Sequence, residues 1–215
     1  MGILQFVKGP TFRRGDFVIF NQQCNIKRPM EKSPTLSDTY LIIDKTVTGD
    51  QSAQHMIAAC ARGIRLIRLR AMGQTDAEYL AWIAVLLPLA KAHGAQVLID
   101  QEDYLHLGAD GLHLNSAALL ACHERPISRQ VYCAASTHDL SQLQHAQHLA
   151  LDFVTLSPVK KTATHPEVKP LGWSVFSQWA TQVQLPVFAL GGLTLVDKDE
   201  AKKWGAYGIA GIRGL

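Results

Sequence analysis

The chain has little cysteine, and its spacing matches no familiar pattern. The four cysteines, Cys24, Cys60, Cys122 and Cys133, are far apart, with no CxxC pair and no metal-ligand spacing. This argues against a disulfide framework and against a metal site built from cysteine. We expect free thiols in a reducing compartment and no bound metal.

Long apolar runs are also absent. No stretch reaches the roughly 18 apolar residues of a membrane span, and the first residues, MGILQFVKGPTFRRGDFVIF, lack the apolar segment and cleavage site of a secretory signal. The net charge is only +3, and the densest basic stretch, residues 62–70, lies within an apolar run. We therefore expect a cytoplasmic protein with neither a nucleic-acid nor a membrane partner.

What is present is a regular alternation of short apolar runs and longer helical patterns. The clearest helical pattern covers residues 76–93, where Pro88 is expected to kink or split the helix. The expected strands are 40–44, 64–70, 96–100, 111–114, 131–135, 153–157, 186–190 and 207–212; the other expected helices are 51–61, 104–107, 117–123, 140–150 and 195–204. Eight such units predict one α/β domain, a parallel (βα)₈ TIM barrel. An open doubly wound sheet is the alternative that periodicity leaves open.

Both ends depart from this alternation. The chain stops at Leu215, so the outer helix that normally follows the eighth strand is expected to be missing. Residues 1–37 show no βα pattern and are interpreted as an N-terminal extension or linker, which places the barrel at residues 38–215.

Chemistry in such barrels lies at the carboxyl ends of the strands. The seventh strand ends in Gly191-Gly192, and the eighth runs through a glycine-bearing segment to Ile212 and Arg213. Paired glycines let backbone N–H groups approach an anion closely. These two loops predict a site for a phosphorylated small molecule, against the alternative that the glycines only turn the chain.

Polar residues also follow the second, fifth and sixth strands. His138, after Ser136, is placed to exchange protons with a ligand, or alternatively lies in the first turn of a capped helix. Arg68 and Arg70 share one face of their strand, so Arg70 either faces a ligand or belongs to an internal ion pair. The loop carrying Thr162, Thr164 and His165 either closes over an anion or is a solvated surface loop; these three form the predicted substrate loop together with Ser136.

The order of these motifs resembles the thiamin phosphate synthase/TenI family over about residues 39–215. The resemblance rests on YLIID, IRLIRLR, LGADGLHL, STH, the SPV loop and PVFALGG. The segments SPVKKTATHPEVKPLGW and GIAGIRGL are most similar to barrel domains fused behind a Nudix (MutT-like) hydrolase. No Nudix box is present in this chain, so a separate Nudix hydrolase is a possible partner, and a homodimer is the family expectation.

The resemblance implies two chemistries. Synthases join a pyrimidine diphosphate to a thiazole phosphate with Mg²⁺, whereas TenI-type members aromatise a thiazole carboxylate phosphate by moving a proton. Several family positions differ here: Arg68 replaces a glutamine, Met72 and His165 replace lysines, and Ala118 replaces an aspartate that binds metal. The Asn-Asp pair of the family falls near Asp100-Gln101.

These differences rank the functions. A site that lacks an acidic ligand and two lysines is expected to bind Mg²⁺–diphosphate poorly. The first hypothesis is therefore a TenI-like thiazole tautomerase, an isomerase without cofactor, with His138 as acid/base and Arg70 in the site. The alternatives are a thiamin phosphate synthase with an altered Mg²⁺ site, and a non-catalytic barrel that binds or senses a phosphorylated ligand.

Overall fold

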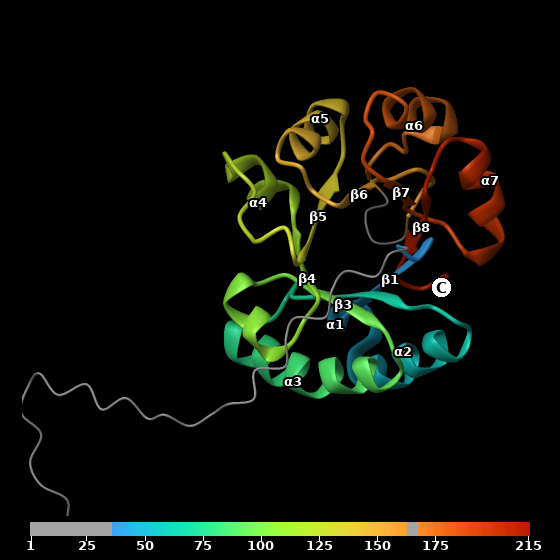
Figure 1. Cartoon of the computed structure of the whole chain (residues 1–215). Coiled ribbons are helices and arrows are strands. Elements are labelled where there is room, and N and C mark those ends of the chain that lie inside the picture. Colours follow the sequence, from blue (N-terminus) through green and yellow to red (C-terminus); the bar gives the residue numbers. More distant parts are fainter. Residues whose placement is uncertain (1–35, 163–166) are drawn as a thin grey trace, which may run out of the picture.

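The computed structural model describes residues 36–162 and 167–215, and within them the chain forms a closed barrel of eight parallel strands. The helices lie outside the strands (Figure 1). The strands are β1 Thr39–Asp44, β2 Leu66–Arg70, β3 Gln96–Ile99, β4 Gly111–Leu114, β5 Tyr132–Thr137, β6 Phe153–Leu156, β7 Val187–Leu190 and β8 Gly208–Gly211. The α-helices are α1 Lys45–Thr48, α2 Ser52–Ala61, α3 Asp76–Ala92, α4 Ser116–Ala121, α5 Leu140–His148, α6 Gly172–Ala180 and α7 Lys198–Lys203, with 3₁₀ turns η1 Gly49–Gln51, η2 Glu102–Leu107 and η3 Leu195–Asp197.

The barrel closes between its first and last strands. Tyr40 of β1 is in register with Leu66 of β2 on one side and with Ala210 of β8 on the other. The predicted TIM barrel is thus confirmed, and the open sheet is excluded. After β8, residues 212–215 contain no helix. Residues 1–35 lie outside the described residues, so the assignment of 1–37 as an extension stays a prediction.

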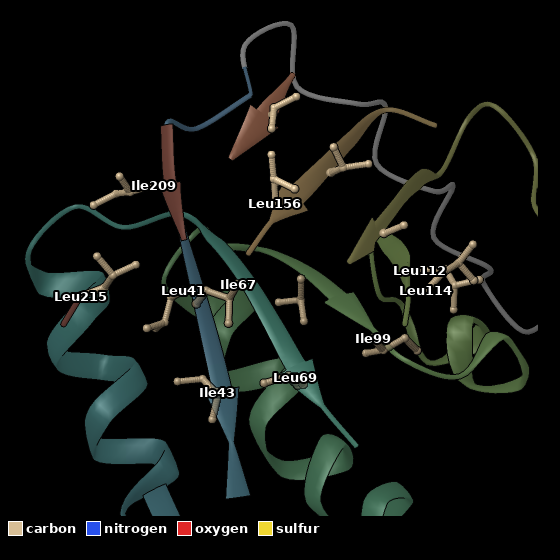
Figure 2. Close-up of a cluster of buried hydrophobic side chains, with 14 of the residues drawn as sticks. Leu41, Ile43, Ile67, Leu69, Ile99, Leu112, Leu114, Leu156, Ile209 and Leu215 are labelled. Carbon is tan, nitrogen blue, oxygen red and sulfur yellow. The ribbon is translucent and has the colours of Figure 1, made fainter. Parts of the chain in front are cut away.

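Strand alternation divides the buried residues into two cores. Leu41 and Ile43 of β1 point outward and pack with the helices, and Figure 2 shows them beside Ile67 and Leu69 of β2. The interior core contains Tyr40, Leu66, Leu98, Tyr132, Ala134, Phe153, Phe188 and Ala210. Tyr40 meets Phe153 edge-on at 5.2 Å between ring centroids, a favourable aromatic geometry. Each fully buried Leu, Ile or Phe contributes roughly 1.5–3 kcal/mol.

Helix α3 is the longest helix, and its start follows from the sequence. Thr75 and Glu78 form a capping box, in which each side chain accepts from the other residue's backbone N–H. The expected split at Pro88 is wrong, because α3 continues through this residue, whereas the kink stays a prediction. Pro88 and Ala84 are both exposed, so water can satisfy the Ala84 carbonyl that the proline ring leaves without a donor.

Two parts of the fold were not expected from periodicity. The short helix α1 follows β1 directly because the Asp44 side chain caps it, accepting from Thr46 N at 3.0 Å. Helix α6 begins at Gly172, which has a φ of +72°, and no side chain caps it. Phe176 and Ala180 are its buried residues, and its start carries no capping residue that the sequence could signal.

The described residues contain no helix that is both long and apolar enough to cross a membrane.

The buried hydroxyl of Tyr79 joins α3 to two strands, and we expect its removal to destabilise the barrel. It donates to Leu69 O at 2.7 Å and accepts from Asp100 N at 3.0 Å. Tyr79→Phe leaves both backbone groups without this partner, which should lower the free energy of unfolding by about 1–3 kcal/mol in urea titrations. Tyr104→Phe is the matched control, and an equal loss in both variants would contradict the assignment.

Candidate functional site

A pocket of about 860 Å³ opens at the carboxyl ends of the strands. Residues at or just after the ends of all eight strands line it, together with the loop that follows β6. The lining residues are Ile42, Arg68, Arg70, Ala71, Met72, Asp100, Gln101, Asn115, Ser116, Ser136, His138, Ser157, Pro158, Thr162, Val168, Lys169, Leu171, Leu190, Gly191 and Ile212. Six predicted site residues therefore meet around one cavity: Arg70, Ser136, His138, Thr162, Gly191 and Ile212.

A buried ion pair forms the floor of this pocket. Arg68 Nε and NH2 donate to the two oxygens of Asp100 at 2.7 and 2.9 Å, a bidentate geometry. Arg68 NH1 also donates to Ser136 Oγ at 3.4 Å. Burial alone would lower the pKa of the Arg68 guanidinium, but Asp100 more than offsets this and the pKa is raised. Arg68 is therefore charged and fixed.

Arg70 lies higher on the same face of β2, at the rim. Its NH1 donates to Asp44 Oδ2 at 3.0 Å, and the Arg70 side chain is 25% exposed while that of Asp44 is 1% exposed. Asp44 also accepts from Thr46 N and Oγ1. The ion-pair interpretation of Arg70 is thus confirmed; Arg70 also lines the pocket, and its role toward a ligand stays a prediction.

His138 lies just beyond β5, where its ring is held in one orientation. Its Nδ1 lies 3.0 Å from the carbonyl oxygen of Ser157, and its backbone N donates to Gln142 Oε1. Because a carbonyl only accepts, Nδ1 donates to Ser157, and Nε2 is the ring nitrogen outside this contact. Asp139 caps α5, as the alternative interpretation expects, and His138 precedes the helix instead of lying in its first turn. His138 also lines the pocket.

The glycine turn after β7 has a packing role that the sequence alone did not reveal. Gly191 and Gly192 have φ values of +108° and +66°. A Cβ on Gly191 would lie 2.8 Å from Pro158 Cα, and one on Gly192 would collide with the Lys161 carbonyl. Backbone bonds from Val159 N to Leu190 O and from Lys160 N to Gly191 O join the two segments. The glycines therefore bring the β6 loop against β7 as well as shaping the pocket wall.

The remaining predicted residues are placed unequally. Gly191 and Ile212 line the pocket, whereas Gly192 and Arg213 lie outside its lining. The carbonyl of Ile212 is held by His55 Nε2 of α2 at 2.9 Å. Thr164 and His165 fall outside the described residues.

Lys169 is the lysine of the β6 loop that lines the pocket, and the sequence analysis did not single it out. Lys160 pairs with Asp197 at 2.7 Å, whereas Lys169 lines the pocket. The one feature of the sequence that could have indicated Lys169 is its position in the segment between β6 and α6.

The sequence analysis also missed a buried series of side-chain hydrogen bonds beneath the pocket. Tyr40 OH lies 3.0 Å from His113 Nδ1, and His113 Nε2 lies 2.9 Å from Ser136 Oγ. Burial, with Arg68 and Arg70 nearby, holds the pKa of His113 well below its usual range, so the ring is neutral. His113 stands in the run GLHL, where only the alternation of inward and outward positions placed it inside the barrel.

The donors present do not fit a magnesium site built by the protein. Among the described residues that line the pocket, Asp100 is the one carboxylate, and its oxygens already accept from Arg68 and from Ala71 N at 3.0 Å. The described part of the chain holds no cluster of three or more His, Cys, Asp or Glu arranged for a metal ion. Magnesium is usually held by one or two carboxylates with substrate phosphates, and here that carboxylate is neutralised.

The closed parallel barrel and its pocket define this chain as a (βα)₈ barrel with a cavity at the carboxyl ends of its strands, where such barrels hold their active sites. A family model described as Thiamine monophosphate synthase matches residues 39–215. The chain belongs to this family. The further likeness to Nudix-fused domains stays a prediction.

Sequence relatives carry the same kind of name. A protein of Aquifex aeolicus (strain VF5) named "Putative thiamine-phosphate synthase 2" is 31% identical over 175 residues, covering 80% of this chain and 94% of the relative. "Thiamine-phosphate synthase" of Prochlorococcus marinus (strain MIT 9313) is 30% identical over 190 residues, or 82% of this chain but 52% of that protein. The chain thus spans about half the length of the second relative.

Solved structures support the fold. Thiamine phosphate pyrophosphorylase from Pyrococcus furiosus matches with a TM-score of 0.67 and 22% identity, covering 81% of this chain and 85% of that one. A 3-hexulose-6-phosphate synthase matches with a TM-score of 0.57 and 16% identity, covering 81% and 89%. At these identities the matches show the barrel alone.

The neutral state of His113 predicts a pH dependence of stability. The unfolded chain binds a proton at this residue below about pH 6.5, whereas the folded chain does not. The unfolded state therefore binds more protons, and stability falls as the pH falls below that value, by up to about 1.4 kcal/mol per pH unit. We expect urea titrations at pH 8 and pH 5.5 to show this loss in the wild type and a smaller one in His113→Gln; identical losses would contradict the prediction.

Proposed function

We propose that this barrel is a thiamine-phosphate synthase, which joins a pyrimidine diphosphate to a thiazole phosphate and releases diphosphate. The family match and the names of the relatives support the synthase more strongly than the tautomerase that the sequence analysis ranked first. The observation that carries the proposal is the position of the pocket, at the carboxyl ends of the strands and lined by matching residues of the family.

The pocket offers charge for two phosphorylated groups. Arg70 and Lys169 provide cations in its wall, and Gly191 and Ile212 also line it. We assign the thiazole phosphate to Gly191 and Ile212, with Gly192 and Arg213 in the adjoining turns, because small residues permit close approach of an anion. Arg70, at the carboxyl end of β2, is assigned to the diphosphate, whose oxygens gain charge as the bond to the pyrimidine breaks.

Thiamine phosphate formation from both substrates, with Mg²⁺ in solution, tests this proposal. We expect enzyme-dependent product in the wild type. In Arg70→Met, kcat/KM should fall about 100-fold, because the variant lacks a positive charge that stabilises the departing diphosphate more in the transition state than in the bound substrate.

Lys91→Met is the matched control for Arg70→Met. Lys91 pairs with a buried carboxylate, Asp110, at the amino-terminal end of the barrel, and its side chain is also 25% exposed. It should lose stability but keep kcat/KM. Absence of product in the wild type would remove the synthase, and an equal fall in both variants would remove the role of Arg70.

The geometry of His138 favours a second candidate, a TenI-like thiazole tautomerase. Its Nδ1–H is engaged by Ser157, which leaves Nε2 as the base. Proton transfer on a bound thiazole carboxylate phosphate needs no metal, which agrees with the pairing of Asp100 by Arg68.

For this candidate, His138→Gln is expected to lower tautomerisation about 100-fold, the usual contribution of a positioned acid/base. The assay follows thiazole absorbance without metal. His106→Gln is the control, since His106 Nδ1 also contacts a backbone carbonyl, that of Asp103, outside the pocket lining. No conversion by the wild type would eliminate the tautomerase. Ligand binding without turnover in either assay would instead favour the non-catalytic barrel.

A further inference from the structure

A buried chain of hydrogen bonds beneath the pocket runs from the apolar core to a hydroxyl group that lines the pocket. Tyr40 and His113 are fully buried, and Ser136 lines the cavity. The chain consists of Tyr40 OH, His113 Nδ1 and Nε2, and Ser136 Oγ, joined at 3.0 and 2.9 Å. Its members come from β1, β4 and β5, so the barrel itself sets their spacing.

The direction of the hydrogens follows from Tyr40. Within the described residues, the Tyr40 hydroxyl has one hydrogen-bond partner, His113 Nδ1. A buried O–H without an acceptor costs about 1–3 kcal/mol, so Tyr40 donates and Nδ1 accepts. Burial raises the pKa of Tyr40 well above its usual range, which keeps that proton on the phenol. The single proton of neutral His113 is then on Nε2, and it is donated to Ser136 Oγ.

Ser136 Oγ therefore accepts hydrogen bonds, and its O–H group remains available as a donor. Its oxygen accepts from His113 Nε2 and from Arg68 NH1 at 3.4 Å, which occupies both lone pairs. The neighbouring interior hydroxyl, Thr155 Oγ1, has no hydrogen-bond partner among the described residues and so does not take the Ser136 proton. The remaining direction for the Ser136 O–H is the pocket.

We propose that Tyr40 and His113 are positioning residues that fix Ser136 as a hydrogen-bond donor, so that the pocket selects ligands with an acceptor atom over the centre of the barrel. This deepens the proposed function, on which it rests: the acceptor is an unprotonated ring nitrogen or a carboxylate oxygen of the phosphorylated thiazole. This chain of hydrogen bonds is not a proton shuttle, because it ends at the Tyr40 phenol, which packs against Phe153 and Phe188.

The tautomer of His113 tests the first half of this proposal without any ligand. In ¹⁵N-labelled protein, long-range ¹H–¹⁵N spectra distinguish a protonated from an unprotonated ring nitrogen. We expect His113 to carry its proton on Nε2 in the wild type, and to show a mixture in Tyr40→Phe, where Nδ1 has lost its donor. A wild-type ring protonated on Nδ1 would overturn the proposal.

Ligand affinity tests the second half. By calorimetry, Tyr40→Phe should weaken thiazole phosphate binding about tenfold and leave the Kd of inorganic phosphate unchanged, because only the ring contact depends on Ser136. Ser136→Ala should give the same loss, and the double variant no further loss, since both act through one hydrogen bond. Additive losses would indicate a merely structural role for Tyr40 and overturn the proposal.

Matched variants separate these effects from general damage. Tyr132→Phe removes another hydroxyl from the same interior core and should leave both affinities unchanged. His113→Gln retains an acceptor and a donor and should keep most of the affinity, whereas His113→Leu should lose it even if Tyr40→Phe folds poorly. If the wild type binds inorganic phosphate but not thiazole phosphate, the proposed function fails, and the His113 spectrum alone decides the arrangement of the chain.

Discussion

The Arg68–Asp100 ion pair is the interaction on which the structure at the carboxyl ends of the barrel strands depends. A guanidinium inside a barrel is costly unless its charge and its donors are met, and Asp100 meets both through two parallel bonds. The same carboxylate accepts from Ala71 N, and Asp100 N donates to Tyr79 of α3, so one pair connects two strands and a helix. Removing one partner from such a pair costs about 3–5 kcal/mol, whereas the net contribution of the intact pair is small. Its effect is therefore mainly to fix where charge lies.

This charge separates the barrel interior into two zones. Toward the amino ends of the strands the interior is filled by aromatic and aliphatic side chains, with Tyr40, Phe153 and Phe188 in mutual contact. Toward the carboxyl ends it carries Arg68, His113 and Ser136, which hydrogen-bond to each other or to the pocket's carboxylate. Tyr40 belongs to both zones, since its ring packs in the first and its hydroxyl bonds to the second. The pocket is therefore polar by construction.

The sequence predicted the strands well because each is a short apolar run whose burial does not depend on its partner. It predicted the inward face of Arg68 and Arg70 for the same reason, since alternation is local. It did not predict their partners, because Asp100 lies 32 residues from Arg68 and the pairing depends on closure of the barrel. His113 was hidden within an apolar strand, and α6 was missed because no side chain caps its start, which leaves no N-terminal signal in the sequence. The glycine turn was correctly placed at the rim, but its close packing against Pro158 required the folded chain.

The charge balance of the floor bears on which chemistry the barrel supports. A free carboxylate at Asp100 would hold a metal ion for a departing diphosphate, but here Arg68 neutralises it. The positive charge available to the ligand is then supplied by Arg70 and Lys169 from the walls. Arg70 is itself shared with Asp44, so its full charge is not available to the ligand. A synthase built this way must stabilise diphosphate with guanidinium and backbone groups, whereas proton transfer by His138 makes no such demand.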